Sequence, residues 1–361
     1  VNLKNVFDSH KNKYGAPFFA LTILVLVIAQ GLTGCTGYSE TIIPYEDRSN
    51  MYLSDTGSDL IRDQIKDGFN SVVRIQNTVT YRTHQFSAGN PLPESQVVSA
   101  NLDSFSVNTV IESHSNSGTA IIMSNGNGRT SLFTASHTVT FPDTIYHYAP
   151  RSTLQEERVV EAVSLKESVS HFFFGAGSVF EFEVIADDPV RDLAVLLYRW
   201  GRDGDPALEP LAIRPGDFER LDWTDRVYVL GYPRGVQMVT SGMVSKQQGN
   251  SRRTFTVDAI FNRGFSGGPM FAVRNDGRGL EWMGVLTSAS AEKEFYLGPD
   301  QRQDIEPSHG NLFTGIPVIQ EISRINYGIS FGADIYQIAD FFEENRAVLR
   351  RNGIPQPDFP D

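Results

Sequence analysis

The sequence has 361 residues, of which 40% are hydrophobic and 20% are charged. This composition supplies enough apolar surface for a core and excludes a collagen-like, low-complexity or disordered chain. Lys and Arg number 31 against 43 Asp and Glu, which gives a net charge of -12 without any basic stretch, so we expect no nucleic-acid partner. The single cysteine, Cys35, excludes an intrachain disulfide and a cysteine-built metal site.

The N-terminal segment carries the pattern of a secretory signal. Lys4, Lys11 and Lys13 precede an apolar run of 14 residues, Ala16–Ala29, and small residues follow it. A membrane-spanning helix needs about 18 or more apolar residues, so this run is too short to span comfortably. A cationic start, a short apolar centre and small residues behind it together predict an export signal.

The segment Leu32-Thr33-Gly34-Cys35 resembles the lipobox of bacterial lipoproteins. The resemblance implies cleavage before Cys35 and acylation of its thiol and new amino terminus, with chains such as palmitate. Several acyl chains anchor a protein stably, which implies a membrane-anchored protein of the bacterial cell envelope, at the outer membrane or periplasmic face. Residues 1–34 would be the signal peptide and residues 35–60 a lipidated tether. The alternative is an ordinary signal peptide with a chance cysteine.

The remainder of the chain is dominated by patterns typical of strands. A short helix is predicted over Ser58–Phe69, where Leu60, Ile61 and Ile65 lie at helical spacing. The segment Asn125-Gly126-Asn127-Gly128 predicts a tight hairpin, because Asn and Gly tolerate positive φ. The expected strands are Ser71–Gln76, Gly118–Met123, Thr130–Ala135, Val179–Ala186, Leu193–Tyr198, Arg226–Leu230, Val239–Ser245, Thr254–Asp258, Gly268–Val273 and Trp282–Thr287.

Strands that follow one another without helices between them favour antiparallel barrels or sandwiches, so we predict an all-β fold. Only the C-terminal segment Ala333–Leu349 predicts a longer helix, since its apolar residues form a stripe. Residues 78–116 and 291–324 are polar and irregular, and we expect long surface loops there.

Two segments place chemically useful side chains at the ends of apolar runs. In Leu132–Val139, an apolar strand leads through small residues to His137. In Asn262–Met270, Ser266 lies in a glycine-rich turn. This pattern predicts an imidazole at a strand end, beside a crevice that a serine can share.

A third segment supplies a carboxylate. Asp192 opens the apolar strand that starts at Leu193, whereas Asp187 and Asp188 lie further from that strand and are less favoured candidates. Asp192 is therefore the expected orienting acid.

The three residue types match the requirements of acyl transfer. A serine hydroxyl is a weak nucleophile until a base accepts its proton, and a buried carboxylate fixes the tautomer of that base. The tetrahedral oxyanion needs two N–H donors, and glycines around Ser266 let the backbone N–H groups of Gly264 and Ser266 face one point. We therefore predict His137 as general base, Asp192 as orienting carboxylate and Ser266 as nucleophile.

These segments also resemble a known family. Gly264-Phe265-Ser266-Gly267-Gly268-Pro269 is similar to the Gly-x-Ser-Gly-Gly-Pro signature of chymotrypsin-fold, trypsin-like serine proteases. Thr134-Ala135-Ser136-His137 and Asp192-Leu193-Ala194 resemble the contexts of the base and the acid, in the chain order of that fold. Gly231-Tyr232-Pro233-Arg234-Gly235 and Tyr327-Gly328-Ile329-Ser330-Phe331-Gly332 extend the resemblance toward the HtrA/Deg branch.

The resemblance implies two antiparallel six-stranded β-barrels with a C-terminal helix, and a protease domain over residues 61–350. Residues 351–361 would be a C-terminal tail, too short for the PDZ domain of typical HtrA proteins. It implies a serine endopeptidase that hydrolyses polypeptides of the cell envelope and uses no cofactor or metal. The seven histidines are scattered, without the spacing of metal ligands. The oligomeric state stays open.

Two positions near the serine bear on specificity and activation. Ile260, six residues before Ser266, occupies the position that forms the floor of the primary pocket in this fold, which predicts cleavage after apolar residues. Packing in the core is the alternative role of Ile260. Phe265 stands where trypsins carry an Asp, so activation by a salt bridge to a freed amino terminus is excluded.

Two other functions compete with the protease. Gly264-Phe265-Ser266-Gly267-Gly268 also fits the nucleophile elbow of α/β-hydrolase esterases, which requires a helix after the serine and an acid and a His downstream. Here a β-type segment follows, which disfavours the esterase. A catalytically silent protease fold that serves as a binding or sensing module is the second alternative.

Overall fold

The computed structural model describes residues 59–87, 91–97, 101–149, 158–201, 204–245, 254–276, 279–299 and 317–360. All of them belong to one compact unit, Ser54–Asp361. The predicted signal peptide, Cys35 and nearly all of the predicted tether lie outside the described residues. In the described ranges, no helix combines the length and the apolar character needed to cross a membrane.

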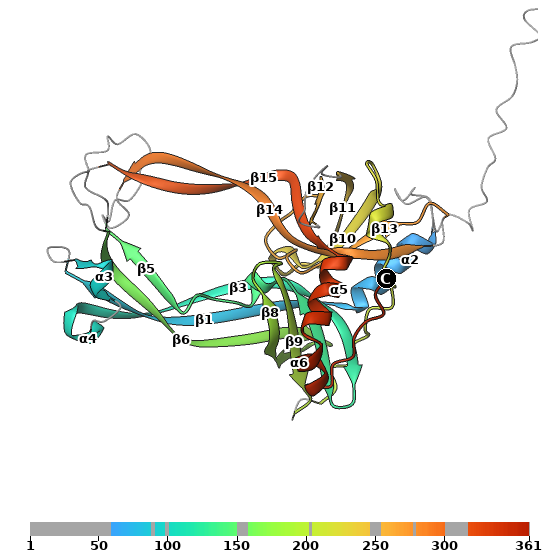
Figure 1. Cartoon of the computed structure of the whole chain (residues 1–361), viewed down its shortest axis with the longest axis horizontal. Coiled ribbons are helices and arrows are strands. Elements are labelled where there is room, and N and C mark those ends of the chain that lie inside the picture. The colour runs from blue at the N-terminus through green and yellow to red at the C-terminus, as the bar shows by residue number, and fades with distance from the viewer. Residues whose placement is uncertain are drawn as a thin grey trace, which may run out of the picture. The chain divides into compact units, whose positions relative to one another are not determined.

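The N-terminal half forms a nine-stranded antiparallel sheet (Figure 1). Seven strands follow the order β2-β6-β1-β3-β4-β9-β8, and β5 and β7 pair with β6. Asn127 and Gly128 join β3 to β4, both with positive φ, which confirms the predicted hairpin. The strands are β1 (Val72–Phe86), β2 (Leu92–Pro93), β3 (Ser106–Gly126), β4 (Arg129–Thr134), β5 (Thr144–Tyr148), β6 (Val159–Gly175), β7 (Ser178–Glu181), β8 (Glu183–Asp188) and β9 (Leu193–Arg199).

The C-terminal half closes into a six-stranded antiparallel barrel in the order β10-β11-β12-β15-β14-β13. Its strands are β10 (Arg226–Gly231), β11 (Met238–Ser245), β12 (Thr254–Val257), β13 (Pro269–Val273), β14 (Leu280–Pro299) and β15 (Pro317–Asp334). The predicted all-β class is confirmed. Of the two six-stranded barrels expected, the C-terminal one is closed as predicted, whereas the described residues of the N-terminal half form a nine-stranded sheet in which the short strands β2, β5 and β7 pair with β6.

Helices are few and lie mostly near the two ends of the described chain. The helix α2 (Asp59–Asn70) confirms the first predicted helix, and α3 (Glu94–Val97) and α4 (Leu102–Phe105) are single turns. The predicted C-terminal helix is present as two, α5 (Ile335–Glu344) and α6 (Arg346–Arg351).

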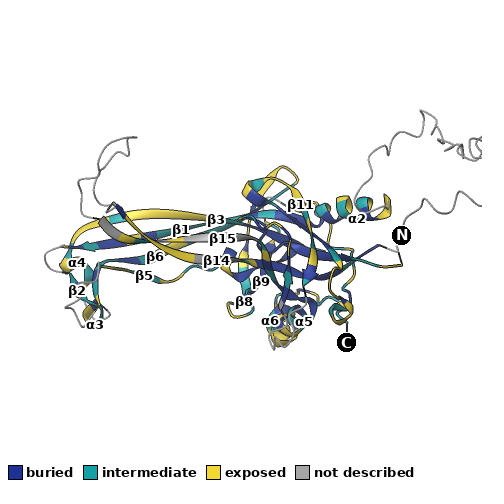
Figure 2. Ribbon diagram, turned by 90° about the horizontal axis from the view of Figure 1, so that it is seen from above, coloured by how far each residue is buried: buried dark blue, intermediate teal, exposed yellow. Residues whose placement is uncertain are grey.

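The long loops expected over residues 78–116 and 291–324 are largely strands instead, so those predictions are wrong for most of their length. β1 and β3 pair along their full lengths, and β14 and β15 extend far beyond the barrel (Figure 1). Side chains along the first half of β3 are exposed or half-buried, as Figure 2 shows for the end of the sheet far from the barrel. In β1, Val79, Tyr81 and Thr83 are buried and alternate with half-buried or exposed residues, whereas the first half of β3 has no such alternation, and backbone pairing with β1 defines it as a strand.

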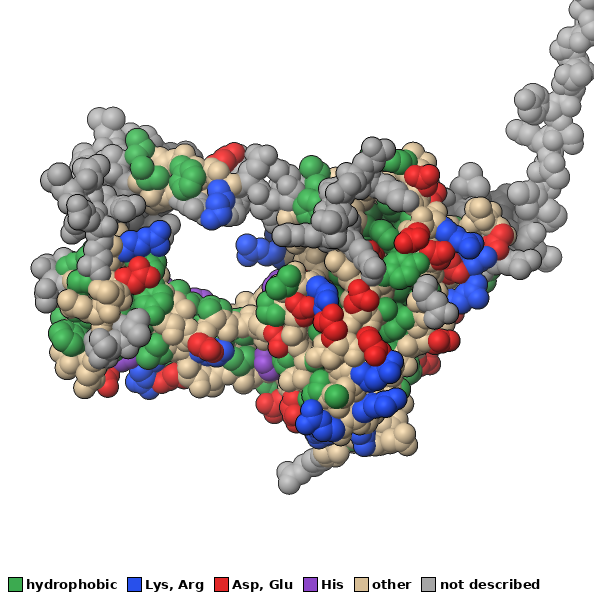
Figure 3. All heavy atoms as spheres, in the orientation of Figure 1, with side chains coloured by type: hydrophobic (Ala, Val, Ile, Leu, Met, Phe, Trp, Pro, Cys, Tyr) green, Lys and Arg blue, Asp and Glu red, His purple; other side chains and the backbone are tan. Residues whose placement is uncertain are grey.

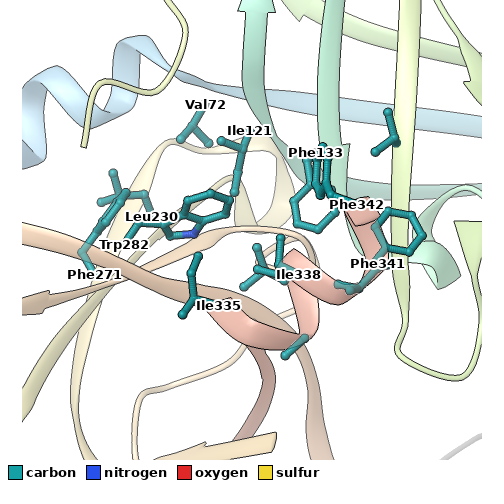
Figure 4. Packing of buried hydrophobic residues seen from close by; sticks show 14 of the residues in the cluster. Val72, Ile121, Phe133, Leu230, Phe271, Trp282, Ile335, Ile338, Phe341 and Phe342 are labelled. Carbon is teal, nitrogen blue, oxygen red and sulfur yellow. The ribbon is translucent and has the colours of Figure 1, made fainter. Parts of the chain in front are cut away.

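The largest core joins the two halves and the C-terminal helices (Figure 4). The Phe133 ring of β4 contacts the rings of Phe341 and Phe342 of α5, with centroids 6.1 and 5.4 Å apart, and Trp282 of β14 at 6.4 Å. Phe359, in the predicted tail, packs against Trp282 at 6.2 Å. This core holds the end of β4, where His137 follows, against the barrel that carries Ser266.

Candidate active site

His137 lies just beyond the end of β4, in a single 3-10 turn, Ser136–Thr138. Its side chain is 47% exposed and so is reachable from solvent. Two amide side chains of neighbouring strands hold the turn: Asn116 Nδ2 donates to the carbonyl of His137 at 3.1 Å, and Asn77 Nδ2 donates to the carbonyl of Thr138 at 2.7 Å. The backbone around the imidazole is therefore fixed from β1 and β3.

Asn77 is fully buried and is itself held by His171 of β6. His171 Nδ1 donates to Asn77 Oδ1 at 2.8 Å, and the imidazole stacks on Phe182 with ring centroids 5.2 Å apart. Burial, and to a smaller extent the charge of Lys166, lowers the pKa of His171. A neutral His171 thus supports the turn that carries His137.

Asp192 directly precedes β9, and its φ of 60° lies in the left-handed region that non-glycine residues rarely adopt. Its carboxylate faces His137: Oδ1 accepts from the His137 backbone N–H at 2.8 Å, and Oδ2 lies 2.7 Å from His137 Nδ1. Asp188 instead accepts from the backbone N–H groups of Val190 and Arg191. Of the three acids considered from the sequence, Asp192 is the one that contacts His137.

The turn that carries Asp192 is tied to the C-terminal helix by Arg191, a contact that the sequence did not indicate. The Arg191 guanidinium donates to both carboxylate oxygens of Glu344 on α5, at 2.6 and 2.7 Å, and to Asp188 Oδ2 at 2.9 Å. The hydrogen bond from Arg191 lowers the pKa of Glu344. This forked pair links the acid turn to an element that packs on the core.

Ser266 lies in the turn before β13, and the residue is 5% exposed. Its Oγ is 2.9 Å from His137 Nε2. With the proton of the neutral imidazole on Nδ1, directed at Asp192, Nε2 is free to accept the hydroxyl proton. The structure thus brings the three predicted side chains from distant parts of the chain into one hydrogen-bonded row.

In the described part of the chain, the serine turn has two backbone N–H groups that no protein acceptor binds. Those of Phe265, Gly267 and Gly268 donate to carbonyls at 2.8–3.1 Å. Within the described residues, no acceptor is bound by the N–H of Gly264 or of Ser266. Gly264 has a φ of 110°, which only glycine adopts readily. These are the two donors that the sequence predicted for an oxyanion.

A buried threonine of β3 holds this turn in place of a terminal salt bridge. Thr119 Oγ1 donates to the carbonyl of Gly264 at 2.6 Å and accepts from the Tyr232 backbone N–H at 2.9 Å. The Thr119 backbone N–H donates to the carbonyl of Ser266 at 2.9 Å. Phe265, 1% exposed, is packed in the barrel core. Sequence reasoning missed this role of Thr119, because nothing local distinguishes a threonine inside an apolar strand.

A cavity of about 310 Å³ opens beside Ser266. Ile260, expected on its floor, is 56% exposed and does not line it. The next residue, Phe261, is 7% exposed and does line it, which corrects the sequence-based assignment by one position. The lining residues are Asn116, Ser117, His137, Phe261, Arg263, Gly264, Ser266, Thr287, Ser288 and Ala289.

Two features bear on the competing esterase function and on metal binding. The serine turn is followed by strand β13 and not by the helix that an α/β-hydrolase elbow requires. In the part of the chain that the structure describes, no three His, Cys, Asp or Glu side chains form a cluster that could hold a metal ion.

Comparison with known proteins agrees with this geometry. Residues 118–280 match the family model of the trypsin-like peptidase domain, a range that contains His137, Asp192 and Ser266. The chain is a serine endopeptidase of the chymotrypsin fold. Its peptidase domain is trypsin-like.

One solved structure similar to this chain is an HtrA-type protease, an AlgW variant with a decapeptide. The match between the two covers 81% of this chain and 68% of the chain of that structure, with 18% sequence identity and a TM-score of 0.43. No curated protein shows significant similarity to the chain.

Proposed function

We propose that the protein is a lipid-anchored serine endopeptidase of the bacterial cell envelope that cleaves polypeptides through an acyl-enzyme on Ser266. The observation that carries the proposal is the row of hydrogen bonds from Ser266 Oγ to His137 Nε2, 2.9 Å, and from His137 Nδ1 to Asp192 Oδ2, 2.7 Å. The first distance allows direct proton transfer from Ser266 Oγ to His137 Nε2. The second allows Asp192 to fix the tautomer of the imidazole.

The reaction follows from these contacts. Ser266 Oγ attacks the substrate carbonyl carbon while its proton passes to His137 Nε2, and Asp192 stabilises the imidazolium. The negative charge that develops on the substrate oxygen is held by the N–H groups of Gly264 and Ser266. His137 then protonates the leaving amine nitrogen, and the C–N bond breaks to give the acyl-enzyme. Water, deprotonated by the same imidazole, hydrolyses the ester and restores the serine hydroxyl.

The proposed specificity is for an apolar side chain before the scissile bond. Phe261 and Ala289 line the cavity with apolar surface, and Thr287 is buried at its wall. A Lys or Arg side chain would bury its charge without a carboxylate among the lining residues, which is costly. A peptide library should therefore give cleavage after aliphatic or aromatic residues, and a profile dominated by Lys or Arg would refute this specificity.

The anchor is proposed from the lipobox-like segment that ends at Cys35. We expect the protein to incorporate labelled palmitate in a bacterial host and to sediment with membranes. The Cys35→Ser variant should lose the label and leave the membrane fraction, while Ser266→Ala should keep both. Equal membrane association of Cys35→Ser and the unaltered protein would contradict lipid anchoring.

A fluorophosphonate probe tests the catalytic part of the proposal. Only an activated serine reacts with it, so the protein should be labelled and the Ser266→Ala variant should not. Asp192→Asn should label about 10⁴-fold more slowly, because the imidazole loses its correct tautomer. A folded protein that does not label, and whose Ser266→Ala variant behaves identically, would indicate a catalytically silent module.

A further inference from the structure

A second cavity, of about 250 Å³, adjoins the cavity beside Ser266. Asn116 and Ser117 of β3 line both of them, so the two cavities share a wall. The second cavity differs from the first in character, because its lining carries two guanidinium groups and no carboxylate. Its other lining residues are Arg74, Gln76, Ser115, Arg234 and Gly235.

The guanidinium of Arg74, on β1, is held from three sides. Its Nη2 donates to Gln76 Oε1 at 2.5 Å, and its Cζ lies 4.6 Å from the centre of the Phe174 ring. The backbone of Gly235 packs so closely that a Cβ there would come within 2.8 Å of Nη1. Among the described residues, no hydrogen-bond partner reaches the buried Nε. The cavity wall thus carries a fixed guanidinium whose hydrogen-bonding capacity the described protein groups leave partly unused.

Arg234 brings a second guanidinium to the same cavity. It belongs to the single turn Pro233–Gly235, its φ of 51° lies in the left-handed region, and the residue is exposed. Its backbone N–H donates to the carbonyl of Arg263 at 3.3 Å. Because Arg263 directly precedes the oxyanion donor Gly264, this hydrogen bond ties the turn of Arg234 to the turn of the nucleophile.

These two arginines differ from most others that the structure describes. On the face of the molecule that Figure 3 shows, acidic and basic side chains lie beside one another on the barrel and the C-terminal helices. Examples are the ion pairs of Arg191 with Glu344 and of Arg274 with Asp276. Within the described ranges, no carboxylate lies at ion-pair distance from Arg74 or Arg234. The second cavity therefore concentrates positive potential, which attracts an anion, in a chain that is acidic as a whole.

The second cavity lies on the leaving side of the scissile bond. The acyl-side residue places its side chain against Phe261 and Ala289, whereas His137 delivers its proton to the leaving amine. Asn116, whose Nδ2 holds the His137 carbonyl at 3.1 Å, belongs to the wall that the two cavities share. A leaving segment that starts beside His137 thus runs past Asn116 and Ser117 into the second cavity.

We propose that Arg74 and Arg234 bind a carboxylate of the leaving segment and give the enzyme a preference for negative charge after the scissile bond. This inference rests on the proposed function. The carboxylate lies within about three residues of the cleaved bond, which is roughly 10 Å of extended chain. It belongs to an Asp or Glu side chain, or to the C-terminus of a substrate with a short leaving segment. Guanidinium groups match the planar carboxylate with paired hydrogen bonds.

Peptides with one acyl side and one scissile bond test the proposal on the full chain. Glu replaces Gln at each of the first four leaving positions in turn, and every peptide has an amidated C-terminus. At one of the first three positions, Glu should raise kcat/KM about tenfold over Gln, since hydrogen bonds to charged groups are stronger than neutral ones. Lys at that position should lower kcat/KM below the value for Gln. Salt at about 0.5 M should reduce the gain from Glu, because it screens partly exposed charges.

The two sources of the carboxylate are distinguished with Gln peptides that have one, two or three leaving residues. Each is compared as a free acid and as an amide. Faster cleavage of the free acid at one length shows that the cavity takes a C-terminus. Faster cleavage of the Glu peptides alone shows that it takes only acidic side chains. Either result supports the inference.

Four variants locate the effect in the second cavity, with the ratio of kcat/KM for the Glu and Gln peptides as readout. Partial loss of folded enzyme leaves this ratio unchanged. Arg74→Gln and Arg234→Gln should each lower it from about ten toward one. Arg234→Glu should favour the Lys peptide over the Glu peptide, a reversal that misfolding cannot produce. The matched control Arg82→Gln alters an arginine of the same strand that is paired with Glu167, and should leave the ratio at about ten.

The outcomes separate this inference from the proposed function. Equal kcat/KM for Glu and Gln at every position, and for acid and amide at every length, would overturn the inference and leave the peptidase intact. A preference for Glu that persists in the double variant Arg74→Gln, Arg234→Gln would overturn it as well.

If no peptide is cleaved and the fluorophosphonate probe does not label Ser266, the proposed function fails. Binding of the Glu and Gln peptides to Ser266→Ala, followed by fluorescence anisotropy, then tests the cavity alone. Tighter binding of the Glu peptide supports the assigned carboxylate site, and equal binding of the two peptides would overturn it.

Discussion

Replacing Thr119 by Val should disable the active site without touching any group that contacts the substrate. The side chain keeps its shape but loses the hydroxyl that joins the Gly264 carbonyl, 2.6 Å away, to the Tyr232 N–H, 2.9 Å away. Both backbone groups would then lack their partner in a place where Thr119 itself is fully buried.

The size of the effect follows from two contributions. Each buried group left without a hydrogen bond costs about 1–3 kcal/mol, enough to let the backbone on both sides of Gly264 move toward other partners. This movement displaces the Gly264 N–H, which lies in the preceding peptide, from the oxyanion, and the loss of one such donor costs about 3 kcal/mol, or roughly 10² in kcat. We therefore expect kcat to fall by about 10²-fold and KM to change little.

The assay is steady-state hydrolysis of a short peptide, with two companion variants. Thr119→Ser keeps the hydroxyl and should recover kcat to within about fivefold of the unaltered enzyme. Thr130→Val is the matched control, since Thr130 is also buried in a strand and its hydroxyl bridges Asn125 and Trp200 away from the site. It should lose similar stability and retain kcat. Equal kcat for Thr119→Val and Thr130→Val would refute the role assigned to Thr119.

Three further predictions concern specificity, pH and stability. Phe261→Ala should enlarge the cavity and shift a peptide-library profile toward larger apolar side chains before the scissile bond, whereas Ile260→Ala should leave the profile unchanged. Because burial lowers the pKa of His171 in the folded state, the unfolded chain binds the proton more readily, so the free energy of unfolding should fall as the pH drops below about 6.5. Urea unfolding at pH 8 and pH 5.5 should show a smaller difference for His171→Gln. Phe133→Ala should lower the free energy of unfolding by about 3–5 kcal/mol, since Phe133 is fully buried against Trp282 and the C-terminal helix, and a loss below about 1 kcal/mol would contradict the core assigned here.

The catalytic residues of the site were predictable because each of them lies in a short contiguous segment with a recognisable sequence pattern. His137 at a strand end, Asp192 at a strand start and Ser266 between glycines each have a local signature, and the fold then brings them within hydrogen-bond distance. Phe261 was missed by one position, because counting back from Ser266 does not reveal which side chain of the irregular turn points inward.

The supporting contacts and the long strands were not predictable in the same way. The hydroxyl of Thr119 acts on Gly264, 145 positions away in the sequence, and Arg191 acts on Glu344, 153 positions away. In the distal part of β14, residues 293–297 are polar and apolar and all of them are exposed, so no alternation marks this segment as a strand. Pairing between distant segments determines these features, and it leaves little trace in local composition.

The most direct test of the central claim is a rapid-mixing experiment with a chromogenic ester. Activation of Ser266 by His137 predicts a burst of released alcohol equal to one equivalent per folded chain, followed by slower turnover as the acyl-enzyme hydrolyses. The burst should disappear in Ser266→Ala and should be at least about 10³-fold slower in His137→Ala. A burst of the same amplitude and rate in either variant would contradict the account.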